Sequence, residues 1–194
     1  MQHYLFGYGS LICTVSRNRH TIGSKAVPVR VKGLQRCWNY HNPHRMRNVL
    51  GVMLKEDAQC NGVLFPVEDF SKLNERESGY DLVEISCENI EVLEGKCPEG
   101  KFWVYIPKQP KYPSAESPIQ QSYLDVVMTG CLEYGEEFAL EMIETTEWSE
   151  HLVNDRDEPN YSRYLENVDV ERIDRILKDV QEIIHLKKVN HKGL

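Results

Sequence analysis

The stretch YLFGYGSLI, residues 4–12, opens the chain as an apolar strand that two glycines and a serine interrupt. We expect residues 3–8 to form a short buried strand, followed by a turn in which bare backbone N–H groups are open to close approach. Such a nest of amides suits a carboxylate or a phosphate, because its donors are fixed before the ligand arrives. The stretch is not a dinucleotide-binding fingerprint, since GYGSLI lacks the third glycine and no βαβ pattern follows.

Composition places the chain among ordinary globular proteins. It has 194 residues, of which 41% are hydrophobic and 27% charged, and it contains no repeat or low-complexity segment. No apolar run approaches the roughly 18 residues of a membrane span, and no signal peptide is visible. These features predict a cytoplasmic protein with no membrane partner. Six scattered cysteines without CxxC pairing predict reduced thiols, most of them buried.

Charge is distributed unevenly along the chain. Residues 1–50 hold eight Lys or Arg and no Asp or Glu, so the remainder carries a net charge of −15 within the total of −7. This basic segment, with Trp38, Tyr40 and His41 interleaved, is compatible with nucleic-acid binding. Pairing with the acidic remainder of the same domain is the stronger interpretation. A third is that the segment supplies positive potential to a pocket for a small anion.

The middle of the chain is predicted to be rich in strands. Alternating or continuous apolar runs predict strands at 26–32 and 34–41, an antiparallel hairpin within 48–67 that turns at Asn61-Gly62, and a further strand over 80–93 paired with 101–108. Between them, residues 68–78 fit a short helix with Phe70 and Leu73 on one face. Gly79 would end that helix in a left-handed cap.

From residue 116 the pattern becomes helical. Ser117-Pro118 is typical of a helix start, and the apolar spacing that follows predicts a helix reaching Leu132. Residues 136–147 predict a second helix and residues 168–188 a third, separated by a long polar loop over 147–167. The fold class is therefore α+β: a small, mostly antiparallel β-barrel with one inserted short helix and helices at the C-terminal end. We expect a domain over 1–132 and a helical extension, 133–194, packed on it.

Three motifs in this order resemble the gamma-glutamyl cyclotransferase-like superfamily: FGYGSL after the first strand, NGVLFPV, and RESGY at 76–80. The resemblance spans residues 3–132. It implies an enzyme that acts on a small γ-glutamyl substrate without a cofactor or metal. It also implies one acid/base, Glu77, and a set of residues that hold the γ-glutamyl group, namely Tyr8, Gly9, Ser10, Leu11 and, from the segment QSYLDVVMTG, Tyr123.

The chemistry of a γ-glutamyl amide explains why one carboxylate and one amide nest suffice. The α-amine closes on the γ-carbonyl, expels the rest of the molecule as an amine, and leaves 5-oxoproline. One group poised near neutral pH can accept and then return the proton. Glu77 lies near a helix C-terminus beside Phe70, Leu73 and Tyr80, where the helix dipole and partial desolvation are expected to raise its pKa.

Other candidate sites are weaker. His41 and His44 are interrupted by Pro43 and have no third ligand nearby, so no zinc site is predicted. No local signature marks a nucleophilic cysteine. Asp155 and Arg156 read as a surface pair or as part of a lid over the leaving group. Tyr123 on an apolar face also fits a core tyrosine with a satisfied hydroxyl.

The leading hypothesis is therefore a gamma-glutamyl cyclotransferase-like enzyme. A non-catalytic domain that binds a γ-glutamyl group or a carboxylate is the second, and a nucleic-acid-binding module is the third. The sequence leaves open whether the leaving group comes from glutathione, a γ-glutamyl amino acid, a γ-glutamylamine or an isopeptide. It also leaves open whether the protein is a monomer or a homodimer.

Overall fold

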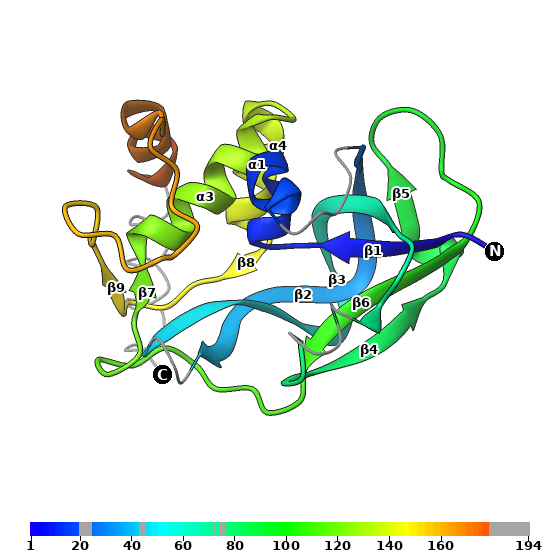
Figure 1. Cartoon of the computed structure of the whole chain (residues 1–194), viewed down its shortest axis with the longest axis horizontal. Coiled ribbons are helices and arrows are strands. Elements are labelled where there is room, and N and C mark those ends of the chain that lie inside the picture. The colour runs from blue at the N-terminus through cyan, green and yellow to red at the C-terminus, as the bar shows by residue number, and fades with distance from the viewer. Residues whose placement is uncertain (20–24, 43–45, 72, 74–76, 179–194) are drawn as a thin grey trace.

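The computed structural model describes residues 1–19, 25–42, 46–71, 73 and 77–178. A curled mixed sheet forms one half of the molecule, and α1, α3 and α4 are grouped in the other (Figure 1). The N-terminus lies at the strand-rich end. The elements, in chain order, are β1 (His3–Gly7), η1 (Ser10–Ile12), α1 (Thr14–Asn18), β2 (Val27–Asn42), β3 (Arg47–Val67), β4 (Tyr80–Ile85), η2 (Cys87–Asn89), β5 (Ile90–Val92), β6 (Lys101–Pro107), β7 (Ile119–Gln120), α3 (Gln121–Leu132), α4 (Glu136–Glu144), β8 (Thr146–Glu147) and β9 (Leu152–Val153).

The main path of the sheet runs β4-β6-β1-β3-β2-β5. The α+β class is as predicted, but a mostly antiparallel barrel is not confirmed. The long pairs β2–β3, β1–β3 and β4–β6 are antiparallel, whereas β1–β6, β2–β8, β3–β7 and β7–β9 are parallel. The sheet is mixed because β1 lies between β3 and β6, and β6 returns to β1 in the same direction.

The predicted hairpin within residues 48–67 is wrong. β3 runs through Asn61-Gly62 as one strand, and these two residues pair with Arg30 and Val29 of β2. Gly62 is required there for space rather than for a turn, because a Cβ would lie 2.5 Å from the carbonyl oxygen of Gly7. The polar stretch between the two apolar runs instead lies where the pairing of β3 with β2 shifts register, between Lys32 and Leu34.

Two strand predictions have the wrong extent. The segments 26–32 and 34–41 join into β2, which passes through Gly33 at a left-handed φ of 82°. The strand predicted over 80–93 breaks at η2, so that β4 pairs with β6 as expected while β5 crosses to the other edge and pairs with β2. The buried apolar side chains of the protein form two clusters, and strands of the sheet contribute to both.

The helix predictions agree with the structure better than the strand predictions do. α3 begins at Gln121 rather than beside Pro118, because Ile119–Gln120 form β7 and pair with β3 and β9. α4 ends at Glu144, and Thr146–Glu147 form β8 against β2. Residues 170–178 are helical, and the rest of the helix predicted to 188 lies outside the described residues. Within the described residues, no helix is both long and apolar enough to cross a bilayer.

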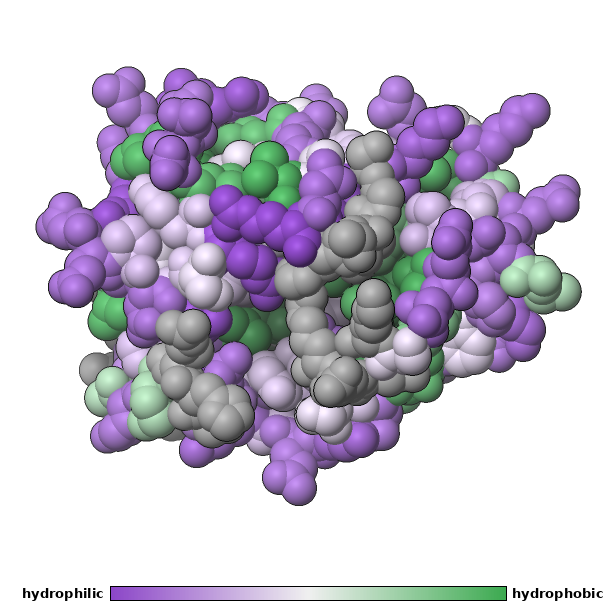
Figure 2. All heavy atoms as spheres, in the orientation of Figure 1, coloured by the Kyte–Doolittle hydropathy of each residue, from purple (hydrophilic) through white to green (hydrophobic). Residues whose placement is uncertain are grey.

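The core joins the helices to the sheet. α3 is buried on almost every side, with Val126, Val127 and Met128 fully inaccessible. α4 turns Phe138, Ala139 and Met142 inward. On the face shown in Figure 2, hydrophilic side chains cover most of the outline and hydrophobic residues show between them. Gly135, at a φ of 105°, links the two helices through a backbone conformation that L side chains rarely adopt.

Candidate active site

The opening stretch places two backbone amides at the end of β1. Gly9 precedes η1, and the Ile12 N–H donates to the Gly9 carbonyl at 2.9 Å, so the Ser10 and Leu11 N–H groups have no acceptor within that helix. The φ of Gly9, −132°, is one that any residue adopts. Glycine is needed there for close approach instead, because a Cβ would lie 2.8 Å from the Tyr123 hydroxyl.

One cavity of about 180 Å³ collects all six residues predicted for the site. The first motif supplies one wall, α3 supplies Tyr123, and the turn before β4 supplies Glu77. The structure therefore brings together residues that lie more than a hundred positions apart in the sequence. The lining residues are Leu5, Phe6, Gly7, Tyr8, Gly9, Ser10, Leu11, Tyr40, Asn42, Arg47, Val49, Leu50, Glu77, Tyr80, Tyr105, Tyr123, Tyr161 and Arg163.

Tyr123 is both a core residue and a wall of the cavity. Its ring meets Trp38 and Tyr161 edge to face, at centroid distances of 5.8 and 4.9 Å. Burial raises the pKa of Tyr123 well above its usual range, while backbone hydrogen bonds from Leu50 and Ser10 act in the opposite direction. The hydroxyl is therefore a neutral group at physiological pH, held beside the amides of the first motif.

Glu77 is fixed by the backbone on both sides. Its N–H donates to the Leu73 carbonyl at 2.8 Å, and its own carbonyl accepts from the Tyr80 N–H at 2.9 Å. Leu73 is buried in the core, and residue 77 is half-buried. The predicted left-handed cap at Gly79 is wrong, since that residue has no positive φ. Gly79 is needed for packing, because a Cβ would lie 2.7 Å from the Tyr40 hydroxyl.

The Glu77 carboxylate acts on a cluster of tyrosines. Burial raises the pKa of Tyr8 well above its usual range, and the Glu77 charge raises it further. The same two causes, in the same order, raise the pKa of Tyr40. For Tyr80 burial is again the first cause, followed by Tyr8 and then Glu77. All three tyrosines line the same cavity as Glu77. The raised pKa expected for Glu77 itself stays a prediction.

Tyrosines form much of the wall, and most of them were not predicted. Six of the ten tyrosines in the chain line the cavity. Tyr40 and Tyr80 stack with their centroids 4.2 Å apart, and the Tyr8 hydroxyl donates to the Tyr105 carbonyl at 2.7 Å. Tyr40 comes from the end of β2 and Tyr105 from β6. No local motif marks these residues, because the register of the sheet brings them together.

Two arginines lie over the ring of Tyr161, and the sequence alone did not assign them to the site. The guanidinium carbons of Arg47 and Arg163 are 4.7 and 5.1 Å from the centroid of that ring. Arg47 also donates to the Asn160 carbonyl at 2.9 Å, and Arg163 to the Ser16 hydroxyl at 3.4 Å. The cavity therefore has a basic part as well as an acidic one.

The loop that carries Tyr161 and Arg163 is fastened to α3. Rather than forming a surface pair, Asp155 accepts from the Ser122 N–H and hydroxyl at 2.8 and 2.6 Å, and Arg156 binds both oxygens of buried Asp125 at 2.8 Å. The Tyr161 N–H in turn donates to the Ser122 hydroxyl at 3.2 Å. These contacts set where the loop enters the cavity wall.

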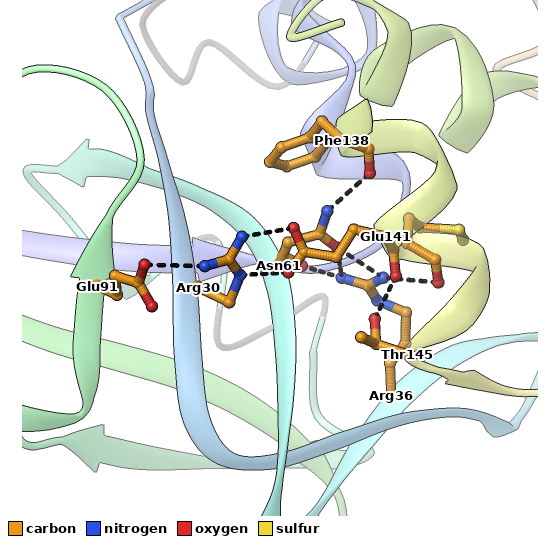
Figure 3. A network of polar contacts seen from close by, with 8 residues as sticks. Arg30, Arg36, Asn61, Glu91, Phe138, Glu141 and Thr145 are labelled. Atoms are coloured by element: carbon orange, nitrogen blue, oxygen red, sulfur yellow. Dashed lines mark hydrogen bonds and ion pairs between the residues drawn. The ribbon is translucent and has the colours of Figure 1, made fainter. Parts of the chain in front are cut away.

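Other parts of the basic segment turn inward and pair within the domain. Arg36 is fully buried and binds the Asn61 side chain and backbone, as well as the Met142 carbonyl. Arg30 bridges Glu91 on β5 and Glu141 on α4 (Figure 3). Trp38 is buried and therefore is not an open stacking platform for bases. The Arg30 bridge therefore fits pairing with the acidic remainder, whereas Arg36 is satisfied by neutral groups.

The remaining candidates do not join the cavity. The His41 Nδ1 lies 2.6 Å from the Ser117 hydroxyl, and His44 lies outside the described residues. Within the part of the chain that the structure describes, no three His, Cys, Asp or Glu side chains are grouped as metal ligands. All six cysteines are free thiols, of which Cys87 and Cys97 are exposed and the other four are buried.

The fold and cavity define a class: an α+β protein whose curled sheet and α3 enclose a small cavity lined with tyrosines. No protein-family model matches the sequence, and no curated protein matches it. A solved structure described as a gamma-glutamyl cyclotransferase is 18% identical, with a TM-score of 0.57 over 92% of this chain and 99% of its own.

Two further structures agree. An uncharacterized protein from Homo sapiens is 18% identical, with a TM-score of 0.56 over 90% of this chain and 98% of its own. YkqA from Bacillus subtilis is 17% identical, with a TM-score of 0.56 over 71% of this chain and 51% of its own. The chain therefore has the gamma-glutamyl cyclotransferase-like fold, which confirms the predicted resemblance at the level of the fold.

Proposed function

We propose that this protein is a gamma-glutamyl cyclotransferase-like enzyme that releases 5-oxoproline from a γ-glutamyl amide or amine. The observation that carries the proposal is that the first motif, Tyr8 to Leu11, lines one cavity together with Tyr123 and Glu77. A bent glutamyl group presents a carboxylate for the amides and an amine for the acid at the same time.

In the proposed reaction, the first motif, Tyr8 to Leu11, and Tyr123 bind the glutamyl headgroup with its α-carboxylate. Glu77 takes a proton from the α-ammonium group, and the freed amine attacks the γ-carbonyl carbon. The new C–N bond closes the five-membered lactam. The old C–N bond then breaks as Glu77 returns the proton to the departing nitrogen. The ring nitrogen loses a second proton when the lactam forms, and this proton also ends on the departing amine, which leaves as an ammonium ion. Atoms and charges balance without any second reactant.

The tyrosine cluster gives Glu77 a setting suited to this role. Tyr8, Tyr40 and Tyr80 line the same cavity as Glu77, and their hydroxyls stay neutral because burial and the Glu77 charge raise their pKa values.

The test compares wild type with Glu77→Gln on a panel of γ-glutamyl compounds, with 5-oxoproline measured directly. We expect a loss of at least about 10²-fold in turnover, the usual contribution of a general acid/base. Glu84→Gln is the matched control, because that glutamate is exposed on β4, pairs with Lys101 and does not line the cavity. Equal rates of 5-oxoproline release for wild type and Glu77→Gln would refute the proposed mechanism.

Equilibrium binding of the same compounds without any 5-oxoproline would instead support the non-catalytic domain. The predictions of no cofactor, no nucleic-acid partner and a monomer or homodimer remain predictions. Retention on an anionic polymer at physiological salt, followed by its loss at higher salt, would favour the nucleic-acid hypothesis.

A further inference from the structure

We infer that Arg17 is a positioning residue for the first motif: it binds the carbonyls of Leu11 and Ile12 and places a positive charge directly behind the cavity wall. The inference rests on the proposed function and extends it to a residue that does not itself line the cavity. Arg17 therefore acts through the first motif, Tyr8 to Leu11, rather than by touching the substrate.

The Arg17 side chain reaches back along the chain from α1. Its backbone N–H donates to the Cys13 carbonyl at 2.9 Å, which places the residue one turn into that helix. Its Nη1 donates to the Leu11 carbonyl at 2.8 Å and also to the Ile12 carbonyl. Its Nη2 donates to the Thr14 hydroxyl at 2.8 Å. One guanidinium fork thus gathers three oxygens that belong to residues 11–14.

The peptide unit between Leu11 and Ile12 is fixed at both ends. Its carbonyl accepts from Arg17, and its N–H, that of Ile12, donates to the Gly9 carbonyl at 2.9 Å. Turning this peptide over would break both bonds and leave a donor and an acceptor unpaired inside the protein. The motif beside it is therefore ordered before a ligand arrives, which lowers the entropic cost of binding.

Arg17 is also a cation with no exposed surface. Within the described part of the chain its guanidinium donates to neutral oxygens, and it reaches a carboxylate only through the Thr14 hydroxyl, which donates to Glu133. Burial raises the pKa of Tyr134 and the Arg17 charge lowers it, so neighbouring groups respond to this cation. A buried charge costs free energy when it is not compensated. An anion at the first motif offsets part of that cost, because Leu11 both lines the cavity and contacts Arg17 through its carbonyl.

The end of α3 supports the same segment. The Glu133 carboxylate accepts from the Thr14 N–H at 3.0 Å as well as from its hydroxyl. Gly130 lets the two segments meet, because a Cβ there would lie 2.3 Å from the Cys13 nitrogen. Since α3 also supplies Tyr123 to the cavity, the first motif and Tyr123 are held in one frame, with Arg17 at its centre.

Arg36 provides an internal comparison. It is as fully buried as Arg17 and also donates to backbone carbonyls, those of Asn61 and Met142, but neither it nor these partners line the cavity. If both arginines serve the core alone, substitutions at the two positions act alike. If Arg17 positions the first motif, only its substitution weakens binding of the headgroup carboxylate.

The test measures binding of two compounds that differ only by the α-carboxylate, γ-glutamylethylamine and 4-amino-N-ethylbutanamide. Calorimetry in a Glu77→Gln background keeps both compounds intact. This background should bind γ-glutamylethylamine roughly 10- to 100-fold more tightly, the range of charge-assisted hydrogen bonds. Arg17→Met should reduce the preference about tenfold or more. Arg17→Lys should restore most of it, because an ammonium group keeps the charge and can still donate to both carbonyls.

A milder pair of variants covers the case in which Arg17→Met does not fold. Thr14→Val removes the hydroxyl that accepts from Arg17 and donates to Glu133, and it keeps the shape of a half-buried side chain. It should lower the preference by about two- to tenfold. Thr14→Ser retains the hydroxyl and should keep the preference.

Arg36→Met and Arg36→Lys are the matched controls, and melting temperatures should show which variants are folded. Both controls should lose stability and keep the preference of the background. A preference that survives unchanged in folded Arg17→Met, or in Thr14→Val where Arg17→Met is unfolded, overturns the inference. An equal loss of preference in Arg36→Met also overturns it, because the effect would then come from a loosened core.

Failure of the proposed function gives a different result. If wild type binds γ-glutamylethylamine preferentially but releases no 5-oxoproline from it, the enzyme proposal fails. Loss of that preference in Arg17→Met would still support the positioning role. If wild type is active and Arg17→Met keeps the preference, only the positioning role fails. Binding of neither compound would refute both.

Discussion

Gly9→Ala offers the sharpest test of the geometry between the first motif and α3. The added Cβ would lie 2.8 Å from the Tyr123 hydroxyl oxygen, where such atoms normally stay about 3.5 Å apart. Tyr123 cannot yield easily, because Trp38 and Tyr161 pack against its ring and the Ser10 and Leu50 amides hold its hydroxyl. Overpacking of this kind costs about 1–3 kcal/mol of unfolding free energy.

The same contact predicts a coupling. Tyr123→Phe removes the oxygen that the new Cβ meets, and by itself it costs about 1–3 kcal/mol because two backbone amides lose their acceptor. In the Tyr123→Phe background, Gly9→Ala should cost about 1 kcal/mol less than it does in wild type. The coupling energy then falls in the range of about 0.5–3 kcal/mol seen for residues in contact.

The assay is urea-induced unfolding of wild type, both single variants and the double variant. Gly95→Ala is the control, because Gly95 has a φ of 84° and open space around its Cβ position, so its cost comes from the backbone alone. That cost should be the same in both Tyr123 backgrounds. If the costs of Gly9→Ala and Tyr123→Phe add within about 0.3 kcal/mol, the two residues do not meet as described.

Two further predictions concern stability. Arg156→Gln should lower the unfolding free energy by about 3–5 kcal/mol in urea titrations, since it leaves the fully buried Asp125 carboxylate without its cation; a loss as small as that of exposed Arg175→Gln would contradict the anchoring role of this pair. The unfolding free energy should also fall as pH rises from about 9 toward 11. Burial raises the pKa of Cys60 to about 11, so the thiol stays protonated in the folded state, whereas the unfolded thiol ionises near 9. Cys60→Ala should flatten this alkaline slope by up to about 1.4 kcal/mol per pH unit, and an unchanged slope would show that the thiol does not contribute.

Short sequence motifs predicted the parts of the site that are formed by neighbouring residues. Tyr8 to Leu11 occupy consecutive positions at the end of a strand, and Glu77 follows a helical turn into the next strand. Their roles could be predicted because strand, glycine and turn patterns act over a few residues. The basic and aromatic half of the cavity offered no such signal, since Arg47, Tyr161 and Arg163 come from segments more than a hundred residues apart.

The errors have the same physical origin. Asn61-Gly62 is a strong local turn signal, but β2 is long enough to pair with both halves of β3, and β1 packs so closely that only glycine fits at position 62. Gly79 likewise reads as a helix cap in isolation, whereas in the structure it makes room for Tyr40. In both places, long-range packing replaced the local reason for a glycine.

The amino-acid order alone therefore determined an α+β protein with bare amides after the first strand and an acid before a later one, because backbone preferences and hydrophobic spacing act between neighbours. Tertiary structure decided that these groups share a cavity with six tyrosines and two arginines. That arrangement depends on strand pairing between β2 and β3 and on the placement of the 147–167 loop, which are properties of the folded chain rather than of any one segment.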